Sequence, residues 1–194
     1  SSIAVKNSHL YEKVYMEARI DELTGLLNRK YFYETLEAEV EKNRHLSLSL
    51  LMVSIDDFKL YNQLYGTREG DFALKQIAGI LSSTIDEHAY AARINGDEFA
   101  LVLPGCDVYS AKCIADNIAE QISSMRISET AGSVTVSIGI CAAPYMASSA
   151  RELYRNADTT VYTVKRTGKN AVQMYSEDID RRVPVASVHK SGYS

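Results

Sequence analysis

The order of helical and strand patterns along the chain predicts an α+β fold. A chain of 194 residues, 46% hydrophobic and 24% charged, suits one globular domain with a sizeable core. Helical and period-two spacings follow each other in the order α, β, α, α, β, β, α, β, α, β. Because helices separate the strands around one central hairpin, we expect an antiparallel central sheet of the ferredoxin-like, split βαβ type, with helices packed around it and covering one face.

Two helices are predicted before the first strand. Residues 3–20 carry apolar residues at a loose three-four spacing, which fits either a surface helix or a signalling helix from an upstream domain. Asn28 is a plausible N-cap for the second helix, which continues to about Arg44. We therefore assign residues 1–20 to an N-terminal signalling or linker helix.

Apolar patterning also predicts the first strand and the helices that follow it. Residues 46–55 begin with strict alternation and then become mostly apolar, as expected of a central strand. A short helix then ends at Gly66, a residue suited to a helix C-terminus. In the next helix, over 68–84, the residues expected to be buried are Phe72, Ile77 and Leu81.

A β-hairpin is predicted over residues 89–103. Asn95 and Gly96 lie between apolar runs and predict a type I′ turn, in which both central residues need positive φ. Two carboxylates, Asp97 and Glu98, follow directly. The turn therefore carries either solvated acids or an acidic site on the rim of the sheet.

The last third of the chain alternates helix and strand before a polar end. The expected elements are a helix over 109–124, a strand over 133–143, a helix over 150–167 and a short strand over 170–175. From Ser176 the sequence is polar, which predicts a tail or linker. The main domain is thus expected over 21–175 and the tail over 176–194.

Composition and charge exclude several classes of protein. The formal charge of −4 gives no general affinity for nucleic acid or anionic membranes. Three cysteines without a CxxC pair and four scattered histidines argue against a disulfide framework or a zinc site and favour a reducing cytoplasm. Since no apolar run reaches about 18 residues, we expect no membrane contact by this chain, and any anchor would lie outside it.

Charged residues gather at three places that suit phosphate or metal chemistry. Asp56 and Asp57 stand where the first strand passes into a helix, whose free N–H groups attract anions. An antiparallel arrangement would bring the Asp97-Glu98 pair beside them, where acids can share Mg²⁺. The third place is the basic stretch "VKRTGKN". Taken alone, each cluster is explained better by helix capping, solvation or the helix dipole than by a binding site.

Five ordered motifs resemble the GGDEF domain, the diguanylate cyclase family with a nucleotidyl-cyclase-like fold. They are "DELTGLLNR", "IDDFKLYNQLYGTREGD", "RINGDEF", "VTVSIGI" and "ADTTVYTVKRTGKN". The resemblance implies a role in cyclic di-GMP signalling. Active members join two GTP molecules across a two-fold dimer with the help of Mg²⁺. A homodimer, or a covalently linked sensor or output domain, is the partner that this implies.

The resemblance places the guanine contacts on Asn62 and Asp71, both present here. An amide can donate and accept, and a carboxylate accepts from guanine N–H groups. The triphosphate contacts fall on the backbone at Asp57 and Phe58 and on two lysines, Lys165 and Lys169. The last position is usually Arg in the family; Lys keeps the charge but loses the bidentate fork.

The metal positions depart from the family pattern. The resemblance places the catalytic acids on Asp97 and Glu98 and the metal contacts on Asp97 and Ile55. A further metal-ligating Asp of the family falls on Ser54, a neutral hydroxyl with one charge and one hard ligand fewer. We therefore expect Mg²⁺ binding to be weak or absent. Asp56 matches a different acid, and strand alternation keeps it from the position of Ser54.

Two further departures affect the signature and the feedback site. The first Gly of the signature is Asn95, giving NGDEF; Asn tolerates positive φ, but its side chain projects where the family leaves room for nucleotide. The RxxD motif that binds product in the family corresponds to residues 86–89, which lack both required residues. Feedback binding of cyclic di-GMP at that place is not expected.

Three functions remain open from the sequence. The first is a degenerate GGDEF domain, catalytically impaired, that binds GTP and regulates another domain. The second is an active diguanylate cyclase that tolerates Ser54. The third is a dimerisation module without nucleotide, against which the retained Asn62 and Asp71 argue.

Overall fold

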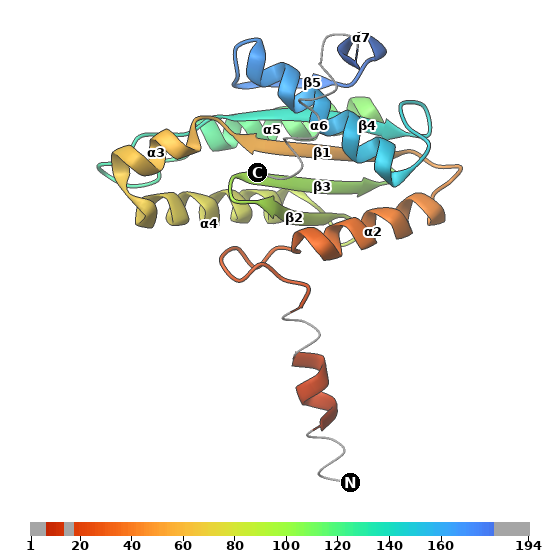
Figure 1. Cartoon of the computed structure of the whole chain (residues 1–194), viewed down its shortest axis with the longest axis horizontal. Coiled ribbons are helices and arrows are strands. Elements are labelled where there is room, and N and C mark those ends of the chain that lie inside the picture. Colours follow the sequence, from red (N-terminus) through yellow and green to blue (C-terminus); the bar gives the residue numbers. More distant parts are fainter. Residues whose placement is uncertain (1–6, 14–17, 181–194) are drawn as a thin grey trace.

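A computed structural model of the chain describes residues 7–13 and 18–180, and residues 18–180 are built around one five-stranded sheet (Figure 1). The strand order is β2-β3-β1-β4-β5. Neighbouring strands are antiparallel, as predicted, except that β5 runs parallel to β4. The strands are β1 (Leu48–Ile55), β2 (Tyr90–Asn95), β3 (Glu98–Pro104), β4 (Val136–Ala143) and β5 (Ala171–Met174).

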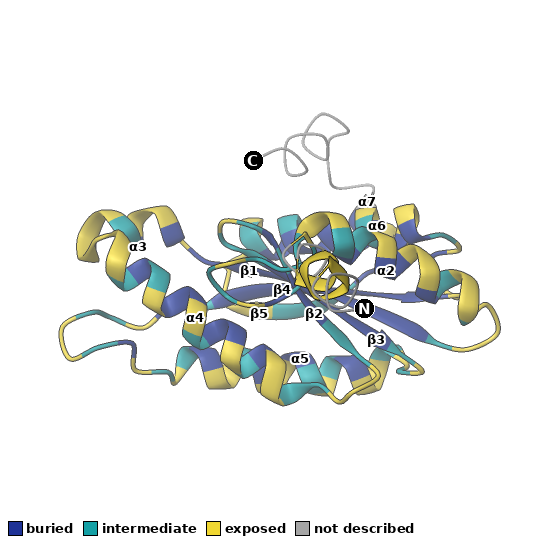
Figure 2. Cartoon of the chain, turned by 90° about the horizontal axis from the view of Figure 1, so that it is seen from below, coloured by how far each residue is buried: buried dark blue, intermediate teal, exposed yellow. Residues whose placement is uncertain are grey.

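Helices cover both faces of the sheet, so the expectation of one covered face is wrong (Figure 2). The cause lies in β1, whose eight residues are all buried and whose six apolar residues divide between two apolar clusters, one on each face of the sheet. One cluster packs against α3, α4 and α5, and the other against α2 and α6. The helices are α2 (Arg29–Lys42), α3 (Phe58–Tyr65), α4 (Thr67–Thr84), α5 (Val108–Ser123), α6 (Ala150–Arg166) and α7 (Glu177–Asp180).

The N-terminal helix ends earlier than predicted. Residues 7–13 are helical and exposed, whereas 1–6 and 14–17 lie outside the described residues. Ala18 and Arg19 form a turn, and Ile20 makes a β-bridge with Leu27. Asn28 fixes this turn, because its backbone N–H donates to the carbonyl oxygen of Arg19 at 2.7 Å. A helix cannot continue through residues that pair in this way.

Helix α2 confirms its predicted cap, whereas α4 corrects one predicted core residue. The Asn28 side chain accepts a hydrogen bond from the backbone N–H of Tyr31 at 2.9 Å. In α4, Ile77 and Leu81 are fully buried, but Phe72 is 47% exposed. Five residues separate Phe72 from Ile77, which turns it about 140° away on a helix. Ala73 and Leu74 face the core instead.

The β2–β3 hairpin has a different turn from the one predicted. Asn95 pairs with Glu98, so Gly96 and Asp97 are its central residues, and neither Asn95 nor Gly96 has positive φ. A bulge between Arg93 and Asn95 changes the local twist and removes the need for a type I′ turn. The Arg93 guanidinium donates to the carbonyl oxygens of Asn95 and Gly96 at 3.3 and 2.9 Å and holds the turn.

The residues directly after Ser176 are helical, whereas the sequence predicts a tail or linker from this point. Residues 177–180 form the short helix α7, and Ile179 is buried at 2% exposure. Residues 181–194 lie outside the described part of the chain. Among the described residues, no helix is both long and apolar enough to span a membrane.

Candidate functional site

The candidate site lies where β1 ends beside the β2–β3 turn. In the register of the two antiparallel strands, Ser54 is opposite Glu98, and the backbone N–H of Ile55 donates to the carbonyl oxygen of Asp97 at 3.0 Å. Only two residues, Asp56 and Asp57, separate the end of β1 from the start of helix α3. The expected meeting of strand end, hairpin turn and helix start is therefore present.

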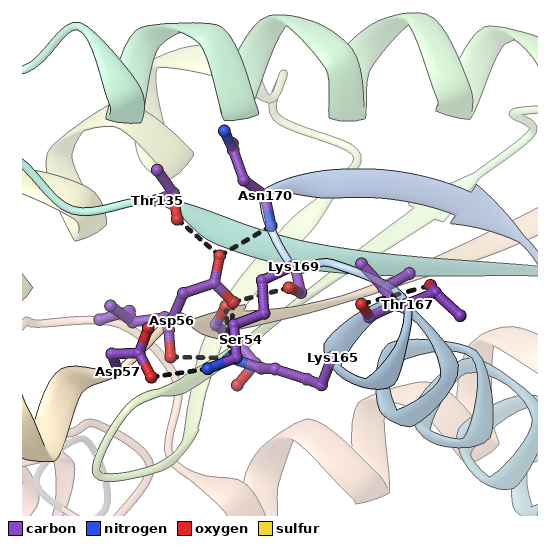
Figure 3. Close-up of polar contacts among 11 residues, drawn as sticks. Ser54, Asp56, Asp57, Thr135, Lys165, Thr167, Lys169 and Asn170 are labelled. Atoms are coloured by element: carbon purple, nitrogen blue, oxygen red, sulfur yellow. Dashed lines mark hydrogen bonds and ion pairs between the residues drawn. The ribbon is translucent and has the colours of Figure 1, made fainter.

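Asp56 points toward Thr135 and Asn170, with the Lys165 ammonium on its other side (Figure 3). Its side chain is 4% exposed. One oxygen accepts from Ser137 Oγ at 2.6 Å and the other from Thr135 Oγ1 at 2.6 Å and the Asn170 backbone N–H at 2.9 Å. Burial alone would raise the pKa of Asp56, but these hydroxyls and the Lys165 ammonium together hold it below its usual range.

The Lys165 ammonium lies in a group of oxygens at the end of β1. Its Nζ donates to the Ile55 carbonyl oxygen at 2.8 Å and to Asp56 Oδ1 at 2.9 Å, and lies 3.5 Å from the Ser54 carbonyl oxygen. Lys169 pairs with Asp57, Nζ to Oδ1, at 2.7 Å on the surface. Both lysines predicted to contact phosphates therefore lie beside the start of α3.

The N-terminus of α3 offers backbone donors. Its N-cap, Asp57, has φ 53° in the left-handed region and makes no side-chain capping bond. The first N–H groups of a helix have no partner within the helix, and the dipole there favours an anion. The backbone around Asp57 and Phe58 thus has the chemistry of a phosphate site.

A cavity of about 300 Å³ adjoins these groups. It brings together the residues predicted to bind guanine with the hairpin acid, and is lined by Phe58, Lys59, Asn62, Asp71, Leu74, Arg93, Gly96 and Asp97. Asn62 Oδ1 is buried with no hydrogen-bond partner. A larger cavity of about 690 Å³, between α2 and the start of α6, includes none of the predicted site residues.

The residues at the implied metal position do not fit Mg²⁺. Ser54 supplies no charge, the Ile55 carbonyl oxygen already accepts from Lys165, and Asp56 is held by hydrogen bonds. Among residues 7–13 and 18–180, no three His, Cys, Asp or Glu side chains form a group that could hold a metal. The hairpin acids and the strand-end acids therefore do not converge on one cation.

Glu98 lies in an acidic and largely dry setting. Burial is the main cause that raises its pKa to about 7. The negative charges of Asp158 and Asp97 raise this pKa further. A hydrogen bond from Asn95 Nδ2 to Glu98 Oε2 at 2.9 Å and the positive charge of Lys165 both lower it. Near neutral pH this carboxyl thus exchanges a proton readily, unlike an ordinary surface acid.

Comparison with known proteins gives the family. The family described as "Diguanylate cyclase, GGDEF domain" matches residues 18–171, most of the chain. The chain belongs to the GGDEF family. Its sheet surrounded by helices is the fold of this family, and its place is in cyclic di-GMP signalling.

Relatives and a solved structure agree with this assignment. The GGDEF chain is 39% identical to YhcK of Bacillus subtilis over 86% of its own length and 48% of that protein. It is 32% identical to the diguanylate cyclase DgcS of Shewanella oneidensis, over 87% and 56% of the two lengths. The coiled coil and GGDEF domain of DgcB from Caulobacter crescentus, solved with c-di-GMP, superposes with TM-score 0.82 and 27% identity, covering 89% and 93%. The chain thus spans about half the length of these two curated relatives.

Some residues that shape the site were not found by sequence reasoning. Thr135 and Ser137 hold Asp56, and Arg93 holds the hairpin turn. A signal for the first two was available, because polar residues two apart in "VTVSIGI" place two hydroxyls on one face of a strand. Arg93, an arginine within an apolar strand two residues before Asn95, is the comparable signal for the hairpin.

Proposed function

We propose that this GGDEF domain binds GTP but turns it over poorly, and that it acts as a regulatory module. The observation that carries the proposal is the end of β1, where Ser54 replaces a carboxylate and Lys165 contacts the Ile55 carbonyl oxygen. A two-metal arrangement needs hard anionic ligands on both sides of the reacting phosphate. At the end of β1, opposite Asp97, Ser54 leaves this site without such an anionic ligand.

Nucleotide binding is supported by residues that the family pattern retains. Asn62 and Asp71 line the same cavity. The amide of Asn62 can donate and accept hydrogen bonds, and the carboxylate of Asp71 can accept them. Lys165 and Lys169 stand beside the uncapped N–H groups of α3. Guanine at one end and phosphates at the other would therefore meet groups of matching chemistry.

The second candidate is an active diguanylate cyclase that condenses two GTP into cyclic di-GMP. Asp97 and Glu98 are both present in the hairpin, which favours it. The Shewanella relative DgcS is itself named a diguanylate cyclase. In either case we propose that the domain works as a homodimer or with a linked sensor or output domain.

The deciding experiment is incubation of the purified chain with GTP and Mg²⁺, and separately with Mn²⁺, followed by chromatography for cyclic di-GMP. We expect saturable GTP binding by calorimetry and no accumulation of product. Product that grows linearly with time and is lost in Asp97→Ala would establish the active enzyme instead. Absence of any thermal shift with GTP would leave a module without nucleotide.

Gly70→Ala is expected to weaken GTP binding by about tenfold or more. A Cβ at position 70 would overlap with the side chain of Asn62, both Oδ1 and Cγ, and would push the amide out of the cavity. Calorimetry with GTP measures the loss. Gly79→Ala in the same helix is the matched control, because a Cβ there meets nothing within 4 Å. Equal affinities for the two variants would remove Asn62 from the proposed guanine site.

A further inference from the structure

We propose that the Lys165 ammonium takes the place of the divalent cation, so that this domain binds GTP without a metal. The inference rests on the proposed GTP binding and goes beyond it by naming the cation of the site. It arises from the contacts of one side chain. Two possible cation ligands at the end of β1, the Ile55 carbonyl oxygen and the Asp56 carboxylate, are both engaged by an ammonium that belongs to the chain.

The surroundings of Lys165 Nζ are those of a bound cation. The Ile55 carbonyl oxygen and Asp56 Oδ1 lie at 2.8 and 2.9 Å, with the Ser54 carbonyl oxygen at 3.5 Å. Carbonyl and carboxylate oxygens are also the ligands that Mg²⁺ selects. The lysine side chain is 25% exposed, so its charge reaches the edge of the site. The protein itself thus holds one positive charge, the Lys165 ammonium, at the end of β1.

A metal ion would have to displace this ammonium, and the displacement is unfavourable. Moving Nζ away would leave Asp56, whose side chain is 4% exposed, without its charged partner. Removing one partner of a buried pair is strongly destabilising. Ser54 contributes no negative charge to offset two like charges at close range. Mg²⁺ therefore gains few ligands here and meets a repelling cation.

The remaining groups suit a phosphate that carries no metal. Lys169 is 41% exposed, and its partner Asp57 is 57% exposed, so this pair can open at little cost. Unpaired N–H groups of α3 add a positive field at the same place. Two ammonium groups and a helix N-terminus supply, without a metal, the positive charge that a polyphosphate needs.

The test is calorimetry of GTP against the whole chain in excess EDTA and in excess Mg²⁺. For the native sequence we expect affinities within about twofold of each other in the two buffers. Ser54→Asp restores a carboxylate beside Glu98, and for this variant we expect Mg²⁺ to tighten binding by about tenfold or more. Native binding that needs Mg²⁺ would overturn the inference and leave the proposed function intact. Absence of GTP binding in both buffers would overturn both.

Lys165→Met gives a second readout in EDTA. We expect GTP affinity to fall by about tenfold or more, because the fixed charge is lost. Lys112→Met is the control, since Lys112 pairs with Asp116 on α5 and takes no part in the site. Unchanged affinity in Lys165→Met would refute the role of this ammonium. Should Lys165→Met not fold, the comparison of native and Ser54→Asp chains decides the question alone.

Discussion

Asp56→Asn is expected to lower the free energy of unfolding by about 3 kcal/mol near neutral pH. Four donors reach the two carboxylate oxygens of Asp56, from Ser137, Lys165, Thr135 and the Asn170 backbone. An amide can accept on one side only, so its NH₂ group would face donors on the other. The substitution also leaves Lys165 without its charged partner.

Asp57→Asn is the matched control, because the neighbouring carboxylate is 57% exposed and makes a surface pair with Lys169. Surface pairs of this kind contribute about 0–1 kcal/mol. Urea denaturation of both variants and the native chain measures the difference. A loss in Asp56→Asn no larger than that in Asp57→Asn would show that the buried contacts around Asp56 contribute nothing to stability.

The stabilisation that Asp56 provides is expected to depend on pH in one direction. The pKa of Asp56 lies below its ordinary value, so its stabilisation is complete above the unfolded pKa of about 4. It is lost as the pH falls through the lower folded pKa. The gap in unfolding free energy between the native chain and Asp56→Asn should therefore close in acid. A gap that stays constant down to about pH 2 would contradict the charged state assigned to Asp56.

Most elements could be predicted from the sequence because each is fixed by local patterning. Asn28 is a helix cap in the sequence and in the structure, and β1 is central because its residues are apolar on both faces. The errors arose where a bridge or a side-chain hydrogen bond, which apolar periodicity does not report, decides the outcome. Ile20 bridges Leu27 and ends the helical region early, and Arg93 wraps the hairpin turn. These contacts join residues two to seven positions apart, but the spacing of apolar residues carries no information about them.

The candidate site could be predicted as a location but not as a set of contacts. Spacing and resemblance place Asn62, Asp71 and Asp97 together, and one cavity contains all three. The side-chain directions of Asp56 and Lys165 could not be predicted in this way. Asp56 is oriented by Thr135, 79 residues later in the chain, and Lys165 by the carbonyl oxygen of Ile55, 110 residues earlier. Neither contact can be read from local spacing. Asp56, which the sequence offers as a possible metal ligand, is instead a buried hydrogen-bond acceptor.

Glu98→Gln is expected to stabilise the chain near pH 8 by about 2 kcal/mol and to have almost no effect near pH 4. Burial raises the pKa of Glu98 to about 7, so the native state holds a proton that the unfolded chain loses above about pH 4.5. The unfolded state therefore binds fewer protons between these values, and stability falls as the pH rises from about 4.5 to 7. Gln is uncharged throughout and still accepts from Asn95.

Denaturation of the native chain and Glu98→Gln at pH values from about 4 to 8 gives the test. Glu34→Gln, an exposed acid on α2, is the control and should follow the native chain at every pH. Curves for Glu98→Gln that run parallel to the native curves would mean that Glu98 is ionised throughout. A widening gap above about pH 5 would instead locate an uncharged acid beside the proposed phosphate site.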